Sequence, residues 1–157
     1  MNAKVILRTA LLAFVVAAVA VTIRREYAAS DGADAASDAA VATLPDEGLV
    51  VAYFHGNVRC PTCQTIERYA REAVDSHLAA ELAGGQVAWR ILNYETASNA
   101  RFASEYEIVA PTVVLVQRHE GRDGQWRNLG RVWELVGDKP AFIEYVAAEA
   151  KEFLAAK

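Results

Sequence analysis

The sequence predicts an α/β domain in which helices cover a mixed central sheet, with elements in the order β-α-β-α-β-β-α. Residues 49–55 (LVVAYFH) form a continuous apolar run, as in a strand that is buried on both faces. Residues 61–85 have the periodicity of an amphipathic helix and end in two glycines. Two later strand-like runs frame a turn signal, which predicts an antiparallel hairpin.

The first predicted helix spans residues 61–85. Pro61 suits a first helical turn, because the N–H group that proline lacks would have no partner there. Cys63, Ile66 and Ala70 recur at helical spacing and therefore share one face. We expect that face to point inward.

The next two elements are a strand and a short helix. Residues 86–94 (QVAWRILNY) have the composition of a strand. Residues 97–108 (ASNARFASEYEI) are expected to form a helix that turns Phe102 and Tyr106 inward. Helices between the first strands predict parallel crossovers.

The hairpin begins with a strand at residues 111–119 (PTVVLVQRH). Residues 120–125 (EGRDGQ) are expected to form its turn, with Asp123 and Gly124 as the hairpin signal. Residues 126–135 (WRNLGRVWEL) are expected to form the return strand. This antiparallel pair makes the predicted sheet mixed.

The last helix is predicted over residues 139–157, with Asp138 as its N-cap. Its apolar stripe consists of Phe142, Ile143, Val146, Ala150, Phe153 and Leu154. A helix of this kind covers one face of a sheet.

Residues 1–27 predict a membrane anchor or a secretory signal. Residues 9–23 are apolar and uncharged, and adding residues 5–8 brings the run close to the ~20 residues that span a bilayer. Arg24 and Arg25 follow directly, where a cleavable signal would more often have small residues. We therefore expect an uncleaved anchor, with secretion after cleavage as the alternative. The balance of basic residues predicts that the remainder faces the periplasm or cell exterior.

Residues 28–48 predict a flexible linker, and residues 49–157 the folded domain. The linker is rich in Ala, Asp and Ser and contains acidic but no basic residues. Such a segment buries too little apolar surface to offset chain entropy. The whole chain of 157 residues has a net charge of -4, so overall charge gives no support to a nucleic-acid partner.

The chain's two cysteines, Cys60 and Cys63, stand in the motif CPTC at the start of the first predicted helix. A helix N-terminus carries partial positive charge and stabilises a nearby thiolate. Cys60 lies at that terminus, and Arg59 adds a neighbouring cation. We therefore expect Cys60 to attack a partner disulfide and the inward-facing Cys63 to resolve the mixed disulfide.

Three interpretations of the cysteine pair compete. A passive disulfide that closes so short a loop gains little entropy. A zinc site needs more ligands than two cysteines, and none of His55, His77 and His119 shows the spacing of a second ligand pair. A redox pair at a strand–loop–helix junction is the favoured interpretation. The alternative is a tethered binding module that holds a soft metal such as Cu(I), with His55 as an accessory ligand or proton donor.

Residues 49–157 resemble the thioredoxin superfamily. The resemblance is carried by the strand VVAYF, the CPTC pair, the segment ILNYETASNARFASEYEI, the segment VAPTVVLV and the hairpin leading to GRVWELVG. It implies a thiol-disulfide oxidoreductase that needs no cofactor and acts on proteins with disulfides or thiols, one of which resets the pair. It also implies a cis Ala110–Pro111 bond facing the cysteines, with Ala110, Pro111 and Thr112 orienting the partner's strand.

The sequence departs from the family pattern near the cysteines. Thioredoxins usually have WCGPC, whereas Arg59 stands here in place of the tryptophan. Arg59, Pro61 and Thr62 are therefore expected to tune the Cys60 thiolate. Cytosolic thioredoxin has a buried Asp in its first active-site strand, where this chain has Ala52 and Tyr53, so proton transfer to Cys63 needs another group or water. The predicted tether resembles that of the extracytoplasmic thiol-disulfide proteins of bacteria.

Overall fold

The computed structural model describes residues 44–156. The predicted anchor at residues 1–27 and most of the predicted linker lie outside the described residues. The elements are β1 (Gly48–His55), α2 (Pro61–His77), α3 (Ala79–Ala83), β2 (Val87–Asn93), α4 (Arg101–Glu105), β3 (Thr112–His119), β4 (Arg122–Asn128), α5 (Val132–Leu135) and α6 (Lys139–Ala155). Within residues 44–156, none of these helices has the length and apolar character to cross a membrane.

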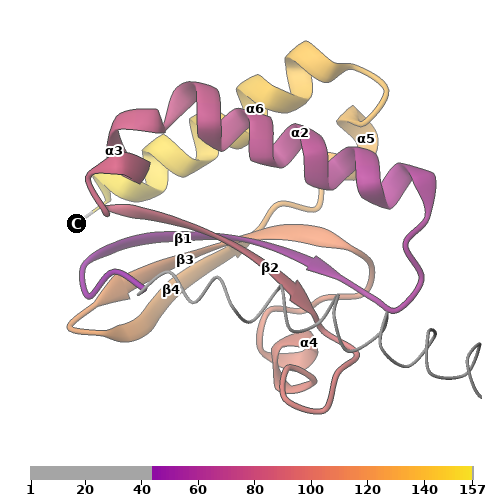
Figure 1. Ribbon diagram of the computed structural model, residues 1–157, viewed down its shortest axis with the longest axis horizontal. Helices are drawn as coiled ribbons and strands as arrows, with labels where there is room; N and C mark the ends of the chain where they lie inside the picture. Colours follow the sequence, from indigo (N-terminus) through magenta and orange to yellow (C-terminus); the bar gives the residue numbers. More distant parts are fainter. Residues whose placement is uncertain (1–43, 157) are drawn as a thin grey trace, which may run out of the picture. The chain divides into compact units, whose positions relative to one another are not determined.

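Four strands form one mixed sheet in the order β2-β1-β3-β4. β1 pairs in parallel with β2 and antiparallel with β3, and β4 is antiparallel to β3. In Figure 1, α2, α3, α5 and α6 cover one face of the sheet and α4 lies on the other. The predicted α/β class with a mixed, helix-covered sheet is confirmed.

β1 supplies apolar side chains to both faces of the sheet. Leu49, Val51 and Tyr53 belong to the core that α2 and α6 complete. The alternate side chains, Val50, Ala52 and Phe54, belong to a second core under α4 that includes Phe102 and Tyr106. The continuous apolar run of β1 follows from this position, because a central strand has no solvent-facing side.

The second crossover differs from the prediction, because β3 runs antiparallel to β1. α4 has 5 residues and spans only about 7.5 Å, at 1.5 Å per residue. A strand of 8 residues, such as β1, spans about 26 Å. Helix α4 is therefore too short to carry the chain back along the sheet, and β3 starts from the end where β2 finishes.

The predicted helix over residues 61–85 is two helices, α2 and α3. Leu78, between them, has φ −129° and ψ 23°, which is not helical. Its side chain is fully buried in the core beneath α2 and α6. Burial of Leu78 thus accompanies a change of direction that periodicity alone did not indicate.

The hairpin turn lies earlier than predicted. His119 pairs with Arg122, so Glu120 and Gly121 form the two-residue loop. Both have positive φ, 51° and 73°, as a type I′ turn requires. Asp123 lies within β4, opposite Arg118, with which it forms an ion pair.

The predicted return strand at residues 126–135 is also wrong in its second half. β4 ends at Asn128, and Val132–Leu135 forms the short helix α5. The Leu129 amide donates to the Val113 carbonyl at 2.8 Å, and the Val132 amide then donates to the Leu129 carbonyl at 3.1 Å. The chain therefore turns back over the start of β3 instead of extending the sheet.

Residues 44–47 pack on the hairpin, although the sequence placed them in the linker. The Glu120 amide donates to Glu47 Oε1, and His119 Nδ1 lies 2.9 Å from Glu47 Oε2. The Gly121 amide donates to the Asp46 carbonyl at 3.0 Å. The hydrogen bond that Glu47 accepts from His119 raises the pKa of His119, and the negative charge of the carboxylate raises that pKa further.

This contact predicts a pH-dependent contribution to stability. Because the folded-state pKa of His119 is raised, the contribution is present below the ordinary value of 6.5 and is lost as pH rises through the raised pKa. Glu47→Gln should lower the urea midpoint most between about pH 5 and 6.5, where His119 is protonated in the folded protein. The difference is expected to be small, because the pair is exposed to solvent.

Glu105→Gln, on α4, is the control for loss of one carboxylate. Urea titrations of both variants at several pH values provide the measurement. A Glu47→Gln effect that is the same at pH 6 and pH 9 would contradict an ionic contribution from His119.

Candidate redox site

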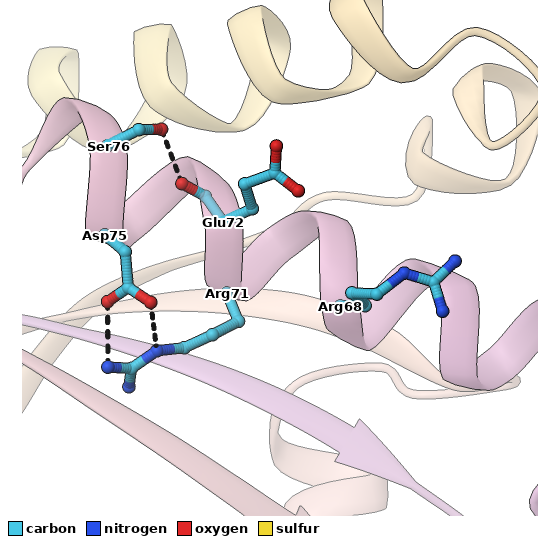
Figure 2. A pocket seen from close by; sticks show the side chains of 5 residues that line it. All are labelled: Arg68, Arg71, Glu72, Asp75 and Ser76. Carbon is cyan, nitrogen blue, oxygen red and sulfur yellow. Dashed lines mark hydrogen bonds and ion pairs between the residues drawn. The ribbon is translucent and has the colours of Figure 1, made fainter.

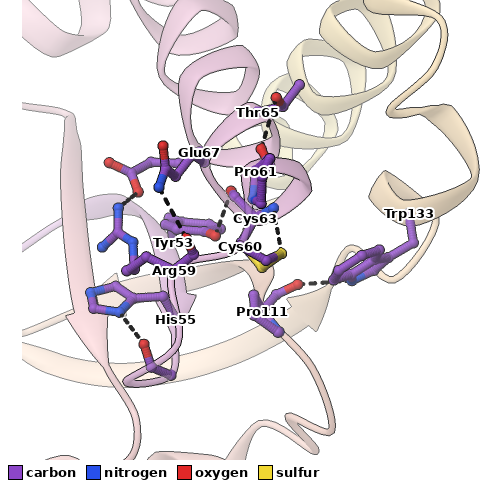
Figure 3. Close-up of a disulfide and its surroundings, with 12 residues drawn as sticks. Tyr53, His55, Arg59, Cys60, Pro61, Cys63, Thr65, Glu67, Pro111 and Trp133 are labelled. Carbon is purple, nitrogen blue, oxygen red and sulfur yellow. Dashed lines mark hydrogen bonds and ion pairs between the residues drawn. A yellow bond between two sulfur atoms is a disulfide. The ribbon is translucent and has the colours of Figure 1, made fainter.

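Cys60 and Cys63 form a disulfide at the start of α2 (Figure 3). Cys60 is the N-cap of α2, and its Sγ accepts a hydrogen bond from the Cys63 amide at 3.0 Å. Cys60 is partly exposed, whereas Cys63 is only 4% exposed. The sulfur at the helix N-terminus is therefore the accessible one, and the other lies inward on the helix.

The loop between β1 and α2 is attached to the end of β2. The Asn57 amide donates to Glu95 Oε2 at 2.9 Å, and Asn93 Nδ2 donates to Asn57 Oδ1 at 2.8 Å. A Cβ on Gly56 would lie 2.7 Å from Glu95 Oε1, so a larger residue would displace the carboxylate that accepts from the Asn57 amide. These contacts hold the segment that leads to Cys60.

Arg59 does not present a free charge to the cysteines. Its guanidinium forms an ion pair with Glu67, which lies one helical turn beyond Cys63. Its carbonyl accepts a hydrogen bond from Gln64 Nε2 at 3.0 Å. The expected tuning of Cys60 by Arg59 is therefore reduced by the opposite charge of Glu67. Through these two contacts, Arg59 attaches the loop between β1 and α2 to helix α2.

Tyr53 connects β1 to the redox helix. Its hydroxyl donates to the Cys63 carbonyl at 2.7 Å, and its side chain is fully buried. Burial raises the pKa of Tyr53, Glu67 raises it further, and Arg59 opposes them. Tyr53 is thus a neutral hydrogen-bond donor at the position where the resemblance indicated a missing carboxylate. The sequence drew attention to this position but did not predict the hydrogen bond.

His55 is buried at the end of β1. Its Nδ1 donates to the Gly56 carbonyl at 2.9 Å, because a carbonyl can only accept. Its ring stacks on Tyr53 with 6.2 Å between centroids. These contacts give His55 a packing role; the predicted accessory role remains a prediction.

The Pro111 loop lies at the start of β3. Figure 3 draws Pro111 beside the disulfide, and the pairing of Tyr53 with Val113 agrees with this placement. The described residues contain no cis peptide bond, so the predicted cis Ala110–Pro111 bond is wrong. The trans isomer is the intrinsically preferred one for a bond preceding proline, by about 0.5–1 kcal/mol.

The three predicted partner-binding residues differ in their exposure to solvent. Ala110 and Pro111 are partly exposed. Thr112 is buried, pairs with Phe54 across the sheet and donates its hydroxyl to Asn128 Oδ1 at 2.8 Å. A partner can therefore reach the loop at Ala110 and Pro111 more readily than at Thr112.

Trp133 is a site residue that sequence reasoning missed. It was expected on the return strand at residues 126–135, but it lies on α5 and is 37% exposed. Its Nε1 donates to the Pro111 carbonyl at 2.8 Å, which brings α5 to the site (Figure 3). Gly130 lies between β4 and α5, and it is the residue in the sequence that could have indicated the end of the strand.

The remaining predicted site residues are accessible. Pro61 occupies the first turn of α2, and both Pro61 and Thr62 are exposed. His77 is exposed, and His119 contacts Glu47. Among residues 44–156, no group of three or more His, Cys, Asp or Glu side chains is arranged to hold a metal ion.

Two hollows lie along α2. Figure 2 shows one of about 370 Å³, lined by Arg68, Arg71, Glu72, Asp75 and Ser76. Its Arg71 is paired with Asp75 at 2.8 Å, so part of its charge is compensated. The other, of about 580 Å³, is lined by Arg59, Gln64, Glu67, Arg68, Arg71, Trp89 and Ile91. Neither lining includes Cys60 or Cys63.

The Tyr53 hydroxyl predicts a measurable contribution to stability. Tyr53→Phe should lower the free energy of unfolding by about 1 kcal/mol, the typical net value of one hydrogen bond. Tyr69→Phe is the matched control, because the Tyr69 hydroxyl forms no hydrogen bond within the described part of the chain. Urea unfolding of the oxidised proteins gives the comparison, and equal stability of the two variants would contradict the role of Tyr53.

Comparisons with known proteins find similarity in structure only. No family model and no curated protein matches the chain. Human ERp44 in its zinc-bound form aligns at 18% identity and a TM-score of 0.46, covering 68% of this chain and 28% of that one. Thioredoxin O2 from Arabidopsis thaliana, in the oxidised state, aligns at 15% identity and a TM-score of 0.39, covering 69% of this chain and 88% of that one.

A thioredoxin from Trypanosoma brucei brucei aligns at 20% identity and a TM-score of 0.36, covering 64% of this chain and 80% of that one. This chain therefore spans well under a third of ERp44 and most of the two thioredoxins. Similarity at these TM-scores, all below 0.5, carries no argument about this chain's activity or partners. The sheet order, the helices on both faces and the disulfide at the start of α2 give the described domain a thioredoxin-like fold.

Proposed function

We propose that the protein is a thiol-disulfide oxidoreductase in which Cys60 and Cys63 exchange electrons with protein partners. The observation that carries the proposal is the asymmetry of the pair. Cys60 is partly exposed and receives the Cys63 amide hydrogen bond at a helix N-terminus, whereas Cys63 is buried. A passive disulfide has no need of one accessible sulfur that is supported by a helix N-terminus.

In the reduced protein, the Cys60 thiolate attacks one sulfur of a partner disulfide. A bond forms between Cys60 and that sulfur, and the other partner sulfur leaves as a thiolate. Cys63 then loses its proton and attacks the Cys60 sulfur, which forms the intramolecular disulfide and releases the second partner thiolate. The partner gains two electrons, and its two thiolates take up the proton lost by Cys63 and one proton from water. The reverse sequence oxidises a partner dithiol.

The partner is expected to approach along the Pro111 loop. Ala110 and Pro111 are accessible and precede β3, so an extended partner segment can lie beside them. A protein dithiol or disulfide of matching potential must reset the pair after each turnover.

We also propose that the domain is anchored in a membrane and faces the periplasm or cell exterior. The support is in the sequence: the apolar run within residues 1–27, its flanking basic residues and the acidic segment that follows. An oxidising compartment suits a disulfide pair, because thiols are otherwise kept reduced.

Trapping of mixed disulfides tests the exchange. Cys63→Ser should accumulate covalent complexes through Cys60, because release requires attack by the missing thiol. Cys60→Ser should accumulate few, because Cys63 is buried. The resolving thiol in the native pair acts at a very high effective concentration, so the contrast between the variants should be large.

Non-reducing gels of membrane and soluble fractions give the readout, with the double variant as control. Complexes in the soluble fraction would contradict the anchor but not the exchange. Absence of complexes from both single variants, together with a stoichiometric metal on the purified dithiol, would replace the exchange with metal binding.

A further inference from the structure

Few large apolar side chains are exposed in the described domain, and one of them contacts the Pro111 loop. Val58 is 78% exposed, Val109 is 97% exposed and Trp133 is 37% exposed, and these are the exposed large hydrophobic residues among residues 44–156. Val58 precedes Cys60 by two residues, and Val109 precedes Pro111 by two. Trp133 is hydrogen-bonded to Pro111. Single exposed apolar residues are normal, so the residue of interest is Trp133, which is the one of the three with a contact at the site.

Trp133 has the most defined position of the three. Its indole N–H is held by the Pro111 carbonyl at 2.8 Å, and α5 begins where Leu129 bonds to Val113 of β3. The ring is therefore oriented before any partner arrives. A pre-oriented aromatic ring loses little conformational entropy when it is covered, so its burial contributes more to binding.

The hydrogen bond also changes what the Pro111 loop offers to a partner. Proline has no N–H, and one acceptor site of the Pro111 carbonyl already serves Trp133. The backbone of Pro111 can therefore form few hydrogen bonds with a partner, and the indole ring of Trp133 supplies contact surface there instead. Arg59, the cation nearest to Cys60 in sequence, is paired with Glu67, so it gives no strong preference for an acidic partner.

We propose that Trp133 is a specificity-determining residue, which selects partner segments that carry an apolar side chain next to the reacting cysteine. Val58 and Val109 are exposed on the segments that lead to Cys60 and to Pro111. The inference rests on the proposed exchange function and adds the chemistry of the partner segment to it.

Kinetics with two peptides test the proposal. Each blocked peptide carries one cysteine as a mixed disulfide with thionitrobenzoate, and the two differ only in Leu or Asn beside the cysteine. Cys60 of full-length Cys63→Ser protein attacks the peptide sulfur and releases coloured thionitrobenzoate. The Leu peptide should react about tenfold faster, the size expected for one well-placed apolar contact. Dithionitrobenzoate, which has no peptide, measures the intrinsic reactivity of Cys60.

Two variants separate the ring from the hydrogen bond. Trp133→Ser should reduce the Leu preference to about one, and it should slow the reaction with the Leu peptide more than the reactions with the Asn peptide and with dithionitrobenzoate. Trp133→Phe keeps an apolar ring but lacks the N–H that orients it, and it should retain only part of the preference.

A Leu preference that survives Trp133→Ser overturns the proposal, as does a wild-type rate that is equal for both peptides. An equal slowing of all three probes by Trp133→Ser overturns it too, because it shows a structural role. Failure of Cys60 to react even with dithionitrobenzoate would instead refute the exchange function.

Discussion

The attachment of the first turn of α2 to β1 is the constraint on which the rest of the site depends. Tyr53 donates to the Cys63 carbonyl from a fully buried position, and the Cys63 amide donates to Cys60 Sγ. One buried phenol and one backbone amide thus connect the central strand to both cysteines. β1 is covered on both faces, so this connection rests on the most deeply buried strand of the sheet. The partly exposed Cys60 sulfur is consequently connected to the core through the backbone of Cys63.

Much of the fold follows from strong local patterns. The apolar run of β1 and the helical face containing Cys63 and Ile66 predicted the central strand and α2, because burial imposes these periodicities. The hairpin turn was misplaced because Asp123-Gly124 is the stronger sequence signal. The observed turn uses Glu120, whose amide is held by Glu47 from a segment far away in the sequence. Local propensity contains no information about such a tertiary partner.

In the candidate site, too, the sequence predicted the features that local patterns set and missed those that depend on tertiary contacts. Cys60 and Cys63 could be singled out as a candidate redox pair from the sequence alone. Their spacing and their position at the start of a helix are both set within one helical turn. Arg59 was expected to act on Cys60, but its pairing with Glu67 depends on rotamers that composition does not reveal. Trp133 was missed because a short helix follows β4 where the apolar pattern suggested more strand. The isomer at Ala110–Pro111 was expected from resemblance, and the structure has no cis bond among residues 44–156.

The central claim is that the two sulfurs are chemically unequal because only Cys60 lies at the N-terminus of α2. The most direct test is competitive alkylation of the reduced full-length protein with iodoacetamide near neutral pH, followed by mass mapping of the two cysteines at short times. Cys60 should be modified first, because its thiolate is both stabilised and accessible. Preferential or equal modification of Cys63 would contradict the assignment of attacking and resolving thiols.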